Sequence, residues 1–297
     1  MSEYKIALKW FLRNVVIVLM NVFMHVLIDI LGDQIVSNNV VLKKREGPNL
    51  IITINRDEKR NALNADIMYG LRDAFQSAAT DPKVRCIIVR GEGKGFSAGI
   101  DFSFLASLGL VGSSGSAVRI KIREAQELVN LIADIEKPVI FAVHGFCYGM
   151  ALELIVSGDF RVAREGTQFG IQEVTVGFIP DMGGIARLTS LLGPIKAKEL
   201  IMTAKVISAD EAKEIQLINE IHPDEMEGAL ALASQLNKNA PLAIGLAKRI
   251  INRGQHMDVR SFMELEAIGQ TTLLATEDVK EGISAKIERR EPIFKGK

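Results

Sequence analysis

The chain has 297 residues, of which 48% are hydrophobic, and its 36 basic side chains balance 36 acidic ones. This length and apolar content allow one large domain, or a domain with a small appendage, and the balanced charge gives no support to nucleic-acid binding. Cys86 and Cys147 lie inside apolar runs, which indicates buried free thiols in a reducing, cytoplasmic compartment. The four histidines show no metal-ligand spacing, so we expect no metal site.

Residues 14–28 form a charge-free and mostly apolar run near the start of the chain. The run is shorter than the roughly 20 residues that cross a bilayer, and no small-x-small cleavage site follows it. One interpretation is a membrane-associated helix. Our hypothesis is that residues 1–36 are an extension outside the native protein, with translation beginning near Val36, so membrane contact is expected only if the extension is real.

The next part of the chain reads as alternating strands and helices. Short β-rich runs at 40–42 and 50–54, separated by Gly47-Pro48, predict a hairpin. Residues 64–80 have helical periodicity with one apolar face, and Asp81-Pro82 ends the helix. Further strands are expected at 85–90, 138–143 and 159–163, and further helices at 117–136 and from 149 to about 157.

Two segments have a different character. The Gly/Ser-rich residues 109–115 predict a mobile loop. After Gly183 the pattern is helical to the end, with one helix opened by Gly193-Pro194 and another by the capping box at 208–211. Strands alternating with helices in the first two-thirds predict an α/β fold, and the helical last third would cover the core or form an oligomer interface.

The strand predicted at 138–143 leads into residues 144–149, where the following helix starts. A helix N-terminus presents unpaired N–H groups and a partial positive charge, which suit a developing oxyanion. Glu153 follows one turn later in an otherwise apolar helix, and unpaired carboxylates are seldom buried. Two interpretations stay open: a catalytic carboxylate beside an oxyanion site, or a surface residue or structural ion pair.

The Gly-rich segment 169–184 carries Glu173 and Asp181. Desolvation by their apolar neighbours would raise the pKa of each carboxyl toward a useful general-acid range, although each could equally be structural. Residues 95–99 satisfy G-x-S-x-G, but the strand ends at Arg90, so the sharp strand-to-serine turn of a nucleophile elbow is absent. The loop 91–95 also lacks the Lys-Ser/Thr pair of a phosphate-binding P-loop.

Five motifs follow one another along the chain. They are Asn55-Arg-Asp-Glu-Lys-Arg-Asn-Ala-Leu63, Gly95-Phe-Ser-Ala-Gly-Ile-Asp101, Lys137-Pro-Val-Ile-Phe-Ala-Val-His-Gly145, Phe169-Gly-Ile-Gln-Glu173 and Ile179-Pro-Asp-Met-Gly-Gly184. Together they resemble the crotonase superfamily, which includes enoyl-CoA hydratases and isomerases. The match covers about residues 38–297, and the ordered set is far more specific than any single motif.

The resemblance implies a crotonase-like α/β fold, with a spiral core of ββα units over 37–235. It also implies a helical C-terminal oligomerisation region over 236–297 and assembly as homotrimers or dimers of trimers. The substrates would be acyl-CoA thioesters of the kind met in fatty acid β-oxidation. Coenzyme A would then be part of the substrate, and no separate cofactor is expected.

The family's oxyanion hole maps onto the backbone N–H groups of Ile100 and Met150. The second position is commonly Gly, so Met150 departs from the pattern, although a backbone donor tolerates a side chain. The two glutamates of the hydratases map onto Glu153 and Glu173. In that chemistry both hold a water; one takes its proton as hydroxide adds to C3, and the other delivers a proton to C2.

Asp181 leaves the reaction open. Ordinary hydratases usually have Gly there, whereas the dienoyl-CoA isomerases have an acidic triad that maps onto 153, 173 and 181. We therefore expect syn hydration of a 2-enoyl-CoA, with isomerisation of a 3,5-dienoyl-CoA or an enoyl-CoA as the alternative. A non-catalytic protein of the same fold is a further alternative. Such a protein would be expected to lack Glu153 or Glu173, and this sequence has both.

Substrate and CoA contacts are implied by the resemblance alone. One of them, Arg289, maps to a basic residue that can reach the 3′-phosphate of CoA from a neighbouring subunit, and its other interpretation is a solvated surface charge. The expected contacts are Lys59, Arg60, Ala62, Ala98, Asp101, Gly149 and Arg289.

Overall fold

The computed structural model describes residues 40–109, 112–255 and 257–297. The extension predicted at 1–36 and the hypothesis on its start lie outside these residues, as does part of the loop predicted at 109–115. Among the described residues, no helix has both the length and the apolar content needed to span a membrane.

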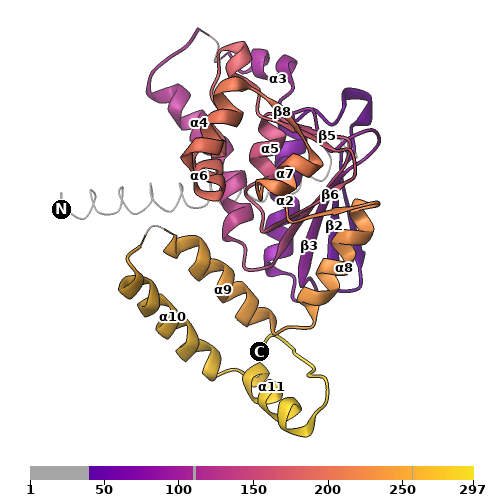
Figure 1. Cartoon of the computed structure of the whole chain (residues 1–297), viewed down its shortest axis with the longest axis vertical. Coiled ribbons are helices and arrows are strands. Elements are labelled where there is room, and N and C mark those ends of the chain that lie inside the picture. Colours follow the sequence, from indigo (N-terminus) through magenta and orange to yellow (C-terminus); the bar gives the residue numbers. More distant parts are fainter. Residues whose placement is uncertain (1–39, 110–111, 256) are drawn as a thin grey trace, which may run out of the picture. The chain divides into compact units, whose positions relative to one another are not determined.

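A six-stranded sheet forms the centre of the fold (Figure 1). Its strands run parallel apart from the first pair, which is the predicted hairpin. The order is β1 (Val41–Glu46), β2 (Asn49–Ile54), β3 (Cys86–Gly91), β4 (Val139–Val143), β6 (Phe160–Arg164) and β9 (Glu220–His222). A second sheet of short strands contains β5 (Phe146–Tyr148), β7 (Gln168–Gly170) and β8 (Val206–Ser208).

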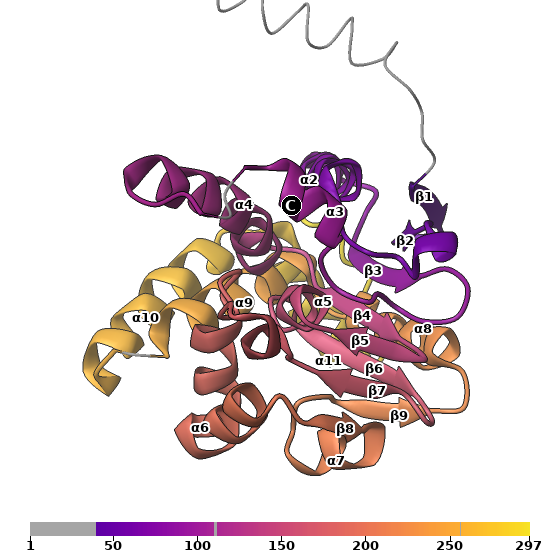
Figure 2. The same ribbon diagram turned by 90° about the horizontal axis from the view of Figure 1, so that it is seen from above.

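Both faces of the six-stranded sheet are buried, which explains the continuous apolar runs of its central strands. Ile88 and Ile140 pack toward α8 (Glu225–Asn237), together with Ala229 and Ala233 of that helix. The opposite face packs against the larger core. Its helices are α2 (Ala65–Thr80), α4 (Ser116–Asp134), α5 (Met150–Ile155) and α6 (Gly184–Thr203). Figure 2 shows α8 and the α2–α5 group on opposite sides of the strands.

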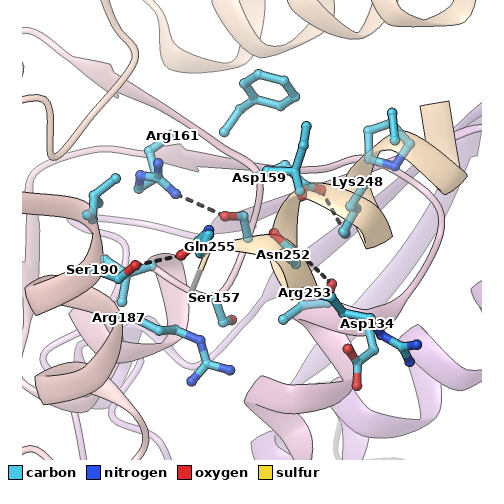
Figure 3. Close-up of a pocket in the computed structure, with 18 of the residues that line it drawn as sticks. Asp134, Ser157, Asp159, Arg161, Arg187, Ser190, Lys248, Asn252, Arg253 and Gln255 are labelled. Carbon is cyan, nitrogen blue, oxygen red and sulfur yellow. Dashed lines mark hydrogen bonds and ion pairs between the residues drawn. The ribbon is translucent and has the colours of Figure 1, made fainter. Parts of the chain in front are cut away.

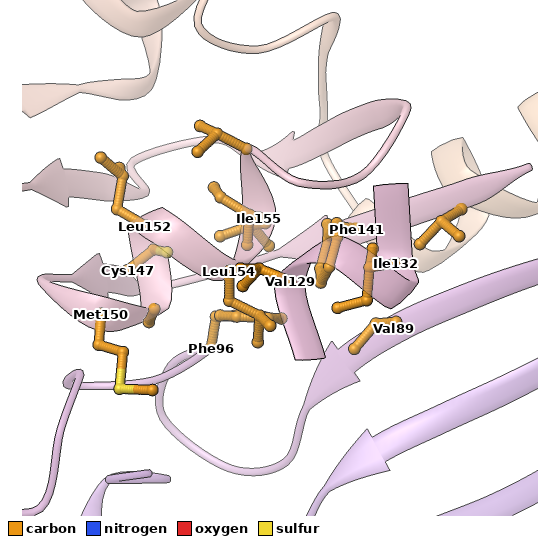
Figure 4. Packing of buried hydrophobic residues seen from close by; sticks show 14 of the residues in the cluster. Val89, Phe96, Val129, Ile132, Phe141, Cys147, Met150, Leu152, Leu154 and Ile155 are labelled. Carbon is orange, nitrogen blue, oxygen red and sulfur yellow. The ribbon is translucent and has the colours of Figure 1, made fainter. Parts of the chain in front are cut away.

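The larger core closes around α5, all of whose residues are buried. Phe96 and Phe141 meet edge to face, with ring centroids 6.0 Å apart, and Figure 4 shows them beside Leu154 of α5. α2 buries the predicted face, and its N-cap Asn64 accepts a hydrogen bond from the amide of Ile67. This tightly packed core fixes α5 from all sides, so the residues at its N-terminus are held rigidly.

The prediction of an all-helical segment after Gly183 is wrong at two places, because β8 and β9 lie there. Each of these strands has only three residues, which is too short to show the alternation of apolar and polar residues typical of a strand. Pairing with a neighbouring strand defines them: β8 pairs with β7 and β9 with β6. β5 also lies within residues 144–149, where no strand was predicted. The expected helix starts are confirmed: Gly193 breaks α6 with φ 75°, and Ser208 caps α7 (Ala209–Glu214).

The last helices form an arm, made of α9 (Pro241–Gly254), α10 (Val259–Leu274) and α11 (Glu277–Glu288). The predicted boundary at 235 falls within the last turn of α8, which packs on the sheet. A buried ion pair joins the arm to the core, because Lys248 of α9 lies 2.8 Å from Asp159, just before β6. The same ammonium donates to the backbone carbonyls of Ile132 and Lys137.

Candidate active site

The site lies where two segments run side by side: the loop that follows β3 and the segment that follows β4. The chain around Ser97 pairs with the chain around β5: Ser97 N donates to Phe146 O at 3.3 Å, and Tyr148 N donates to Ser97 O at 3.1 Å. Gly99 has φ +90°, and a Cβ placed there would lie 2.6 Å from Tyr148 O. Only glycine allows this approach, which brings Gly99 against the amide of Met150.

The amides of Ile100 and Met150 are both free. Leu63 N donates a hydrogen bond to Gly99 O, and Asp101 N donates one to Leu63 O. These bonds involve the residues on either side of Ile100 and leave its own N–H without a partner in the described structure. Met150 is the first residue of α5, so its N–H has no partner within the helix. Neither amide donates a hydrogen bond within the described part of the chain. Two such donors, one with the partial positive charge of a helix end, suit an oxygen that gains negative charge.

Glu153 lies one turn into α5 and is 1% exposed. Its Oε2 accepts hydrogen bonds from the amides of Met182 and Gly184, both at 2.8 Å. Burial raises the pKa of Glu153 to about 8 against these two bonds, and the nearby charges of Glu173 and Asp181 raise it further. Among the described residues no cation forms an ion pair with it, although Arg187 lies close enough for the charge of Glu153 to act on its guanidinium, whose pKa burial lowers overall. Two amides, and no paired cation, therefore hold this carboxyl in place.

Glu173 begins the short helix η2 (Glu173–Val176) and faces the start of α5. A Cβ on Gly149 would lie 2.9 Å from its Oε1, so the carboxyl rests against the residue before Met150. Its Oε2 is buried and has no hydrogen-bond partner in the described structure. Burial raises the pKa of Glu173, and the charge of Asp181 adds to the effect. An unsatisfied buried carboxyl oxygen is costly, and here it lies beside the free amide.

Asp181 stands at the solvent edge of the same group. Its side chain is exposed, while partial burial of the carboxyl raises its pKa. Its charge acts on both Glu153 and Glu173, so the three predicted carboxyls form one cluster. Its backbone carbonyl accepts from the Gln126 side chain at 2.6 Å, which fixes the segment to α4.

Ser97 of the G-x-S-x-G pattern is fully buried, and its hydroxyl is occupied at both ends. It donates to Asn61 O at 2.8 Å and accepts from Gly99 N at 3.1 Å. The serine therefore shapes the loop and has no free hydroxyl for nucleophilic attack. Free Cys86 and Cys147 are buried as expected, and no described group of three or more His, Cys, Asp and Glu residues is arranged to hold a metal.

Asn61 and Arg56 were not predicted individually, although both lie in the first motif. Buried Asn61 has φ +54°; its amide donates to Glu92 O and Gly95 O, and its Oδ1 accepts from Arg56 N. Arg56 donates to Ala62 O and forms a 2.7 Å ion pair with Asp101. These contacts tie the 56–62 turn to the loop that carries the Ile100 amide. The first motif is mostly polar and charged, so nothing in the sequence singled these two residues out.

A family model described as enoyl-CoA hydratase/isomerase matches residues 46–297. The chain belongs to this enoyl-CoA hydratase/isomerase family. It is 38% identical to a crotonyl-CoA hydratase of Syntrophomonas wolfei over 86% of this chain and 97% of the relative. It is 31% identical to a peroxisomal dienoyl-CoA isomerase of Arabidopsis thaliana over 86% and 95%. The crystal structure of an enoyl-CoA hydratase from Bacillus anthracis superposes with a TM-score of 0.81 at 30% identity, covering 87% and 100%. The predicted fold and family are confirmed.

Most contacts that family resemblance implies lie near the carboxyl cluster. Ala98 N donates to Arg60 O, which places the predicted 59–62 contacts alongside the Ile100 loop, with Lys59 and Arg60 exposed. Asp101 caps α3 (Phe102–Ser107) and follows the Ile100 amide. Gly149 borders Glu173. Arg289 is different: it ends α11, at the far end of the arm in Figure 1, and a single chain does not bring it to the cluster.

A cavity of about 1040 Å³ lies elsewhere, where the arm meets the core (Figure 3). None of the three site carboxyls lines it. Its buried cations are already satisfied by the protein: Lys248 by Asp159 and two carbonyls, and Arg161 by the carbonyls of Leu217, Ile155 and Gly158. The cavity is therefore a feature of the joint between the arm and the core, separate from the carboxyl cluster.

Proposed function

We propose that this member of the enoyl-CoA hydratase/isomerase family catalyses the reversible syn hydration of a 2-enoyl-CoA to a 3-hydroxyacyl-CoA. One observation carries the proposal: the amides of Ile100 and Met150 have no partner in the described part of the chain, and they lie near the buried Glu153 and the half-buried Glu173, neither of which forms an ion pair there. Family membership and similarity to a crotonyl-CoA hydratase support the same reaction.

The thioester oxygen would bind between the two amides, where charge develops as the thioester becomes enolate-like. C2 is bonded to the thioester carbon, so the carboxyl closest to the Met150 amide is the one that reaches it. Glu173 rests against Gly149 and has a free oxygen, which assigns it the proton for C2. Glu153, held by two amides, would position the water and accept its proton as hydroxide adds to C3.

The proton balance follows from this arrangement. Hydration needs the form in which Glu173 is protonated and gives its proton to C2, while Glu153 is ionised and takes the proton of the water. Burial raises the pKa of both carboxyls, that of Glu153 to about 8, so ionisation of Glu153 increases as pH rises toward 8. The reverse reaction uses the same two groups with exchanged roles, and no cofactor is required.

Isomerisation of a 3,5-dienoyl-CoA or an enoyl-CoA is the second candidate. The specific observation in its favour is Asp181, a third carboxyl close enough to influence both glutamates. One carboxyl could then remove a proton from the substrate while another returns it several carbons away. Similarity to the dienoyl-CoA isomerase of Arabidopsis supports this candidate as well. A non-catalytic role is weaker, because unneutralised buried carboxyls lower stability.

Self-association completes the proposal. Large apolar side chains are exposed along α6 and the arm; among them Ile195 is 79% exposed, Val259 75% and Ile287 77%. Such surfaces are typical of protein interfaces. We expect homotrimers or dimers of trimers in which Arg289 of one subunit approaches the CoA of another.

Within one subunit, CoA would be contacted by Lys59, Arg60, Ala62 and Ala98. The two buried free thiols fit a cytoplasmic protein. The acyl-CoA substrates would be those of fatty acid β-oxidation.

The deciding experiment is parallel incubation with crotonyl-CoA and with a 3,5-dienoyl-CoA, followed by absorbance of the conjugated double bond. Loss of absorbance with crotonyl-CoA is expected for hydration, since the conjugated double bond disappears. Turnover of the dienoyl-CoA alone would favour isomerisation over hydration. Turnover of neither would refute hydration and dienoyl-CoA isomerisation, and a 3-enoyl-CoA added as a third substrate tests enoyl-CoA isomerisation. Light scattering after size-exclusion chromatography checks the oligomeric state.

A further inference from the structure

His144 lies just after β4 and is 4% exposed. Its Nε2 is 2.9 Å from the carbonyl oxygen of Gly93. Its Nδ1 is 3.4 Å from Oε1 of Glu225, the first residue of α8 and 0% exposed. Both Nδ1 and this Oε1 are buried and have no hydrogen-bond partner as placed. Two unsatisfied polar atoms therefore face one another inside the protein.

No neutral form of His144 satisfies both neighbours. With the proton on Nε2, the ring donates to Gly93 O, but the Nδ1 lone pair faces a carboxylate oxygen. With the proton on Nδ1, the ring donates to Glu225, but the Nε2 lone pair faces the carbonyl. The doubly protonated ring donates at both ends and removes the conflict.

The alternative, a protonated Glu225, is opposed by its other partner. Arg164 Nε donates to Oε2 of Glu225 at 2.6 Å, and a guanidinium favours the ionised carboxylate. Glu225 also opens α8, whose N-terminal amides favour negative charge. The remaining titratable or charged side chains on the segments around His144 are Glu92, Lys94, Glu165, His222 and Asp224. Asp224 lies 3.7 Å from Arg164, and His222 accepts from the Asp224 amide.

We infer that His144 is held as an imidazolium that bridges Gly93 and Glu225, and that it positions the loop carrying the Ile100 amide. The loop is held on its other side by Asp57, whose Oδ1 accepts from Lys94 N at 3.0 Å. Further along, Phe96 N donates to the carbonyl of His144 itself at 2.9 Å. The side chain and backbone of one residue thus fix both ends of the segment 93–96, four residues before Ile100.

The positioning part of this inference rests on the proposed function, since the loop matters only if the Ile100 amide binds the thioester. The protonation part does not. Both contacts need a proton on each ring nitrogen, so a ring that lacks either proton makes only one of them.

The test is the ¹⁵N–¹H spectrum of the imidazole groups of the whole protein at neutral pH, with the His144 signals assigned from His144→Leu. Two protonated ring nitrogens are expected for His144, and a neutral ring would overturn the inference. In Glu225→Gln, the amide group can donate to Nδ1 while its oxygen accepts from Arg164. We therefore expect a neutral ring with the proton on Nε2 and an unchanged bond to Gly93.

Kinetics test the positioning role. His144→Leu is expected to lower kcat for crotonyl-CoA by about ten-fold or more with little change in KM, because the oxyanion donor is displaced rather than lost. Glu225→Gln should keep kcat within a few-fold. His222→Gln is the matched control and, apart from the loss of the His222 signals themselves, should alter neither the His144 signals nor the rate. An unchanged kcat in folded His144→Leu would overturn the positioning role. Absence of any turnover in the natural protein would refute the proposed function instead. The imidazole spectrum would then still test whether the His144 ring is doubly protonated.

Discussion

Two carboxyl groups in the interior of this protein differ in how their charge is compensated. Asp159, at the joint between core and arm, is compensated by the Lys248 ammonium at 2.8 Å and by the amide of Val139. Glu153, in α5, has two amide partners, no ion pair among the described residues, and two other carboxyls near enough to raise its pKa. A charge that the fold neutralises supports structure, whereas a charge that it fixes and leaves unneutralised remains available to a substrate.

The largest effect is expected from Glu173→Gln. The substitution keeps size and polarity but removes the proton that goes to C2, so kcat should fall by about 10²- to 10⁴-fold at similar KM. Steady-state kinetics with crotonyl-CoA measure it. Glu264→Gln, an exposed change on α10, is the matched control and should leave kcat unaltered. Unimpaired turnover of Glu173→Gln would remove this residue from the mechanism.

Lys248→Met tests the neutralised side of the comparison. It leaves Asp159 buried without its cation, and such a loss typically costs 3–5 kcal/mol of unfolding free energy, so we expect about that amount. Denaturant unfolding measures it, and kcat of the folded fraction should stay near normal. The exposed pair of Lys205 and Glu211 supplies the control, since Lys205→Met should change stability by less than about 1 kcal/mol. Equal losses in the two variants would contradict the distinction.

Glu153→Gln should lower turnover yet raise stability. Folding raises the pKa of Glu153 from 4.5 to about 8, so the native state holds its proton more tightly than the unfolded chain. Below pH 4.5 both states are protonated and ionisation has no cost; the cost grows as pH rises and is complete above about 8. The glutamine avoids it, and we expect a gain on the order of a few kcal/mol at pH 8 that vanishes near pH 4. Unfolding of both proteins across this pH range is the measurement. A loss of stability at pH 8 would show that the carboxylate is compensated after all.

The smallest effect on hydration is expected from Asp181→Asn. Asp181 lies at the solvent edge, so its removal should change the hydration rate by only a few-fold while lowering any dienoyl-CoA isomerisation severely, by about 10²-fold if it acts as an acid or base. Assays of one preparation with both substrates make each reaction the control for the other. Damage confined to hydration would reverse the assignment.

The contrast between these carboxyls could not be predicted from their neighbours in the chain. Glu153 stood out because it interrupts the apolar run 151–156, and Glu173 and Asp181 because they lie in a Gly-rich segment. The donors that hold Glu153 belong to Met182 and Gly184, about thirty residues away. Lys248 gave no signal at all, since an isolated lysine in an amphipathic helix resembles an ordinary surface residue until its partner Asp159 is known.

The sequence by itself determined the family, through five motifs in order, and the elements whose pattern is local: the hairpin, the apolar face of α2, the buried central strands and the cap at Ser208. Periodicity and capping act within one or two turns, so a short window of sequence contains them. Only the tertiary structure decided the strands β5, β8 and β9, the free amides at Ile100 and Met150, and which buried charges are neutralised. Each of these depends on a partner far along the chain, and distance in sequence carries no information about distance in space.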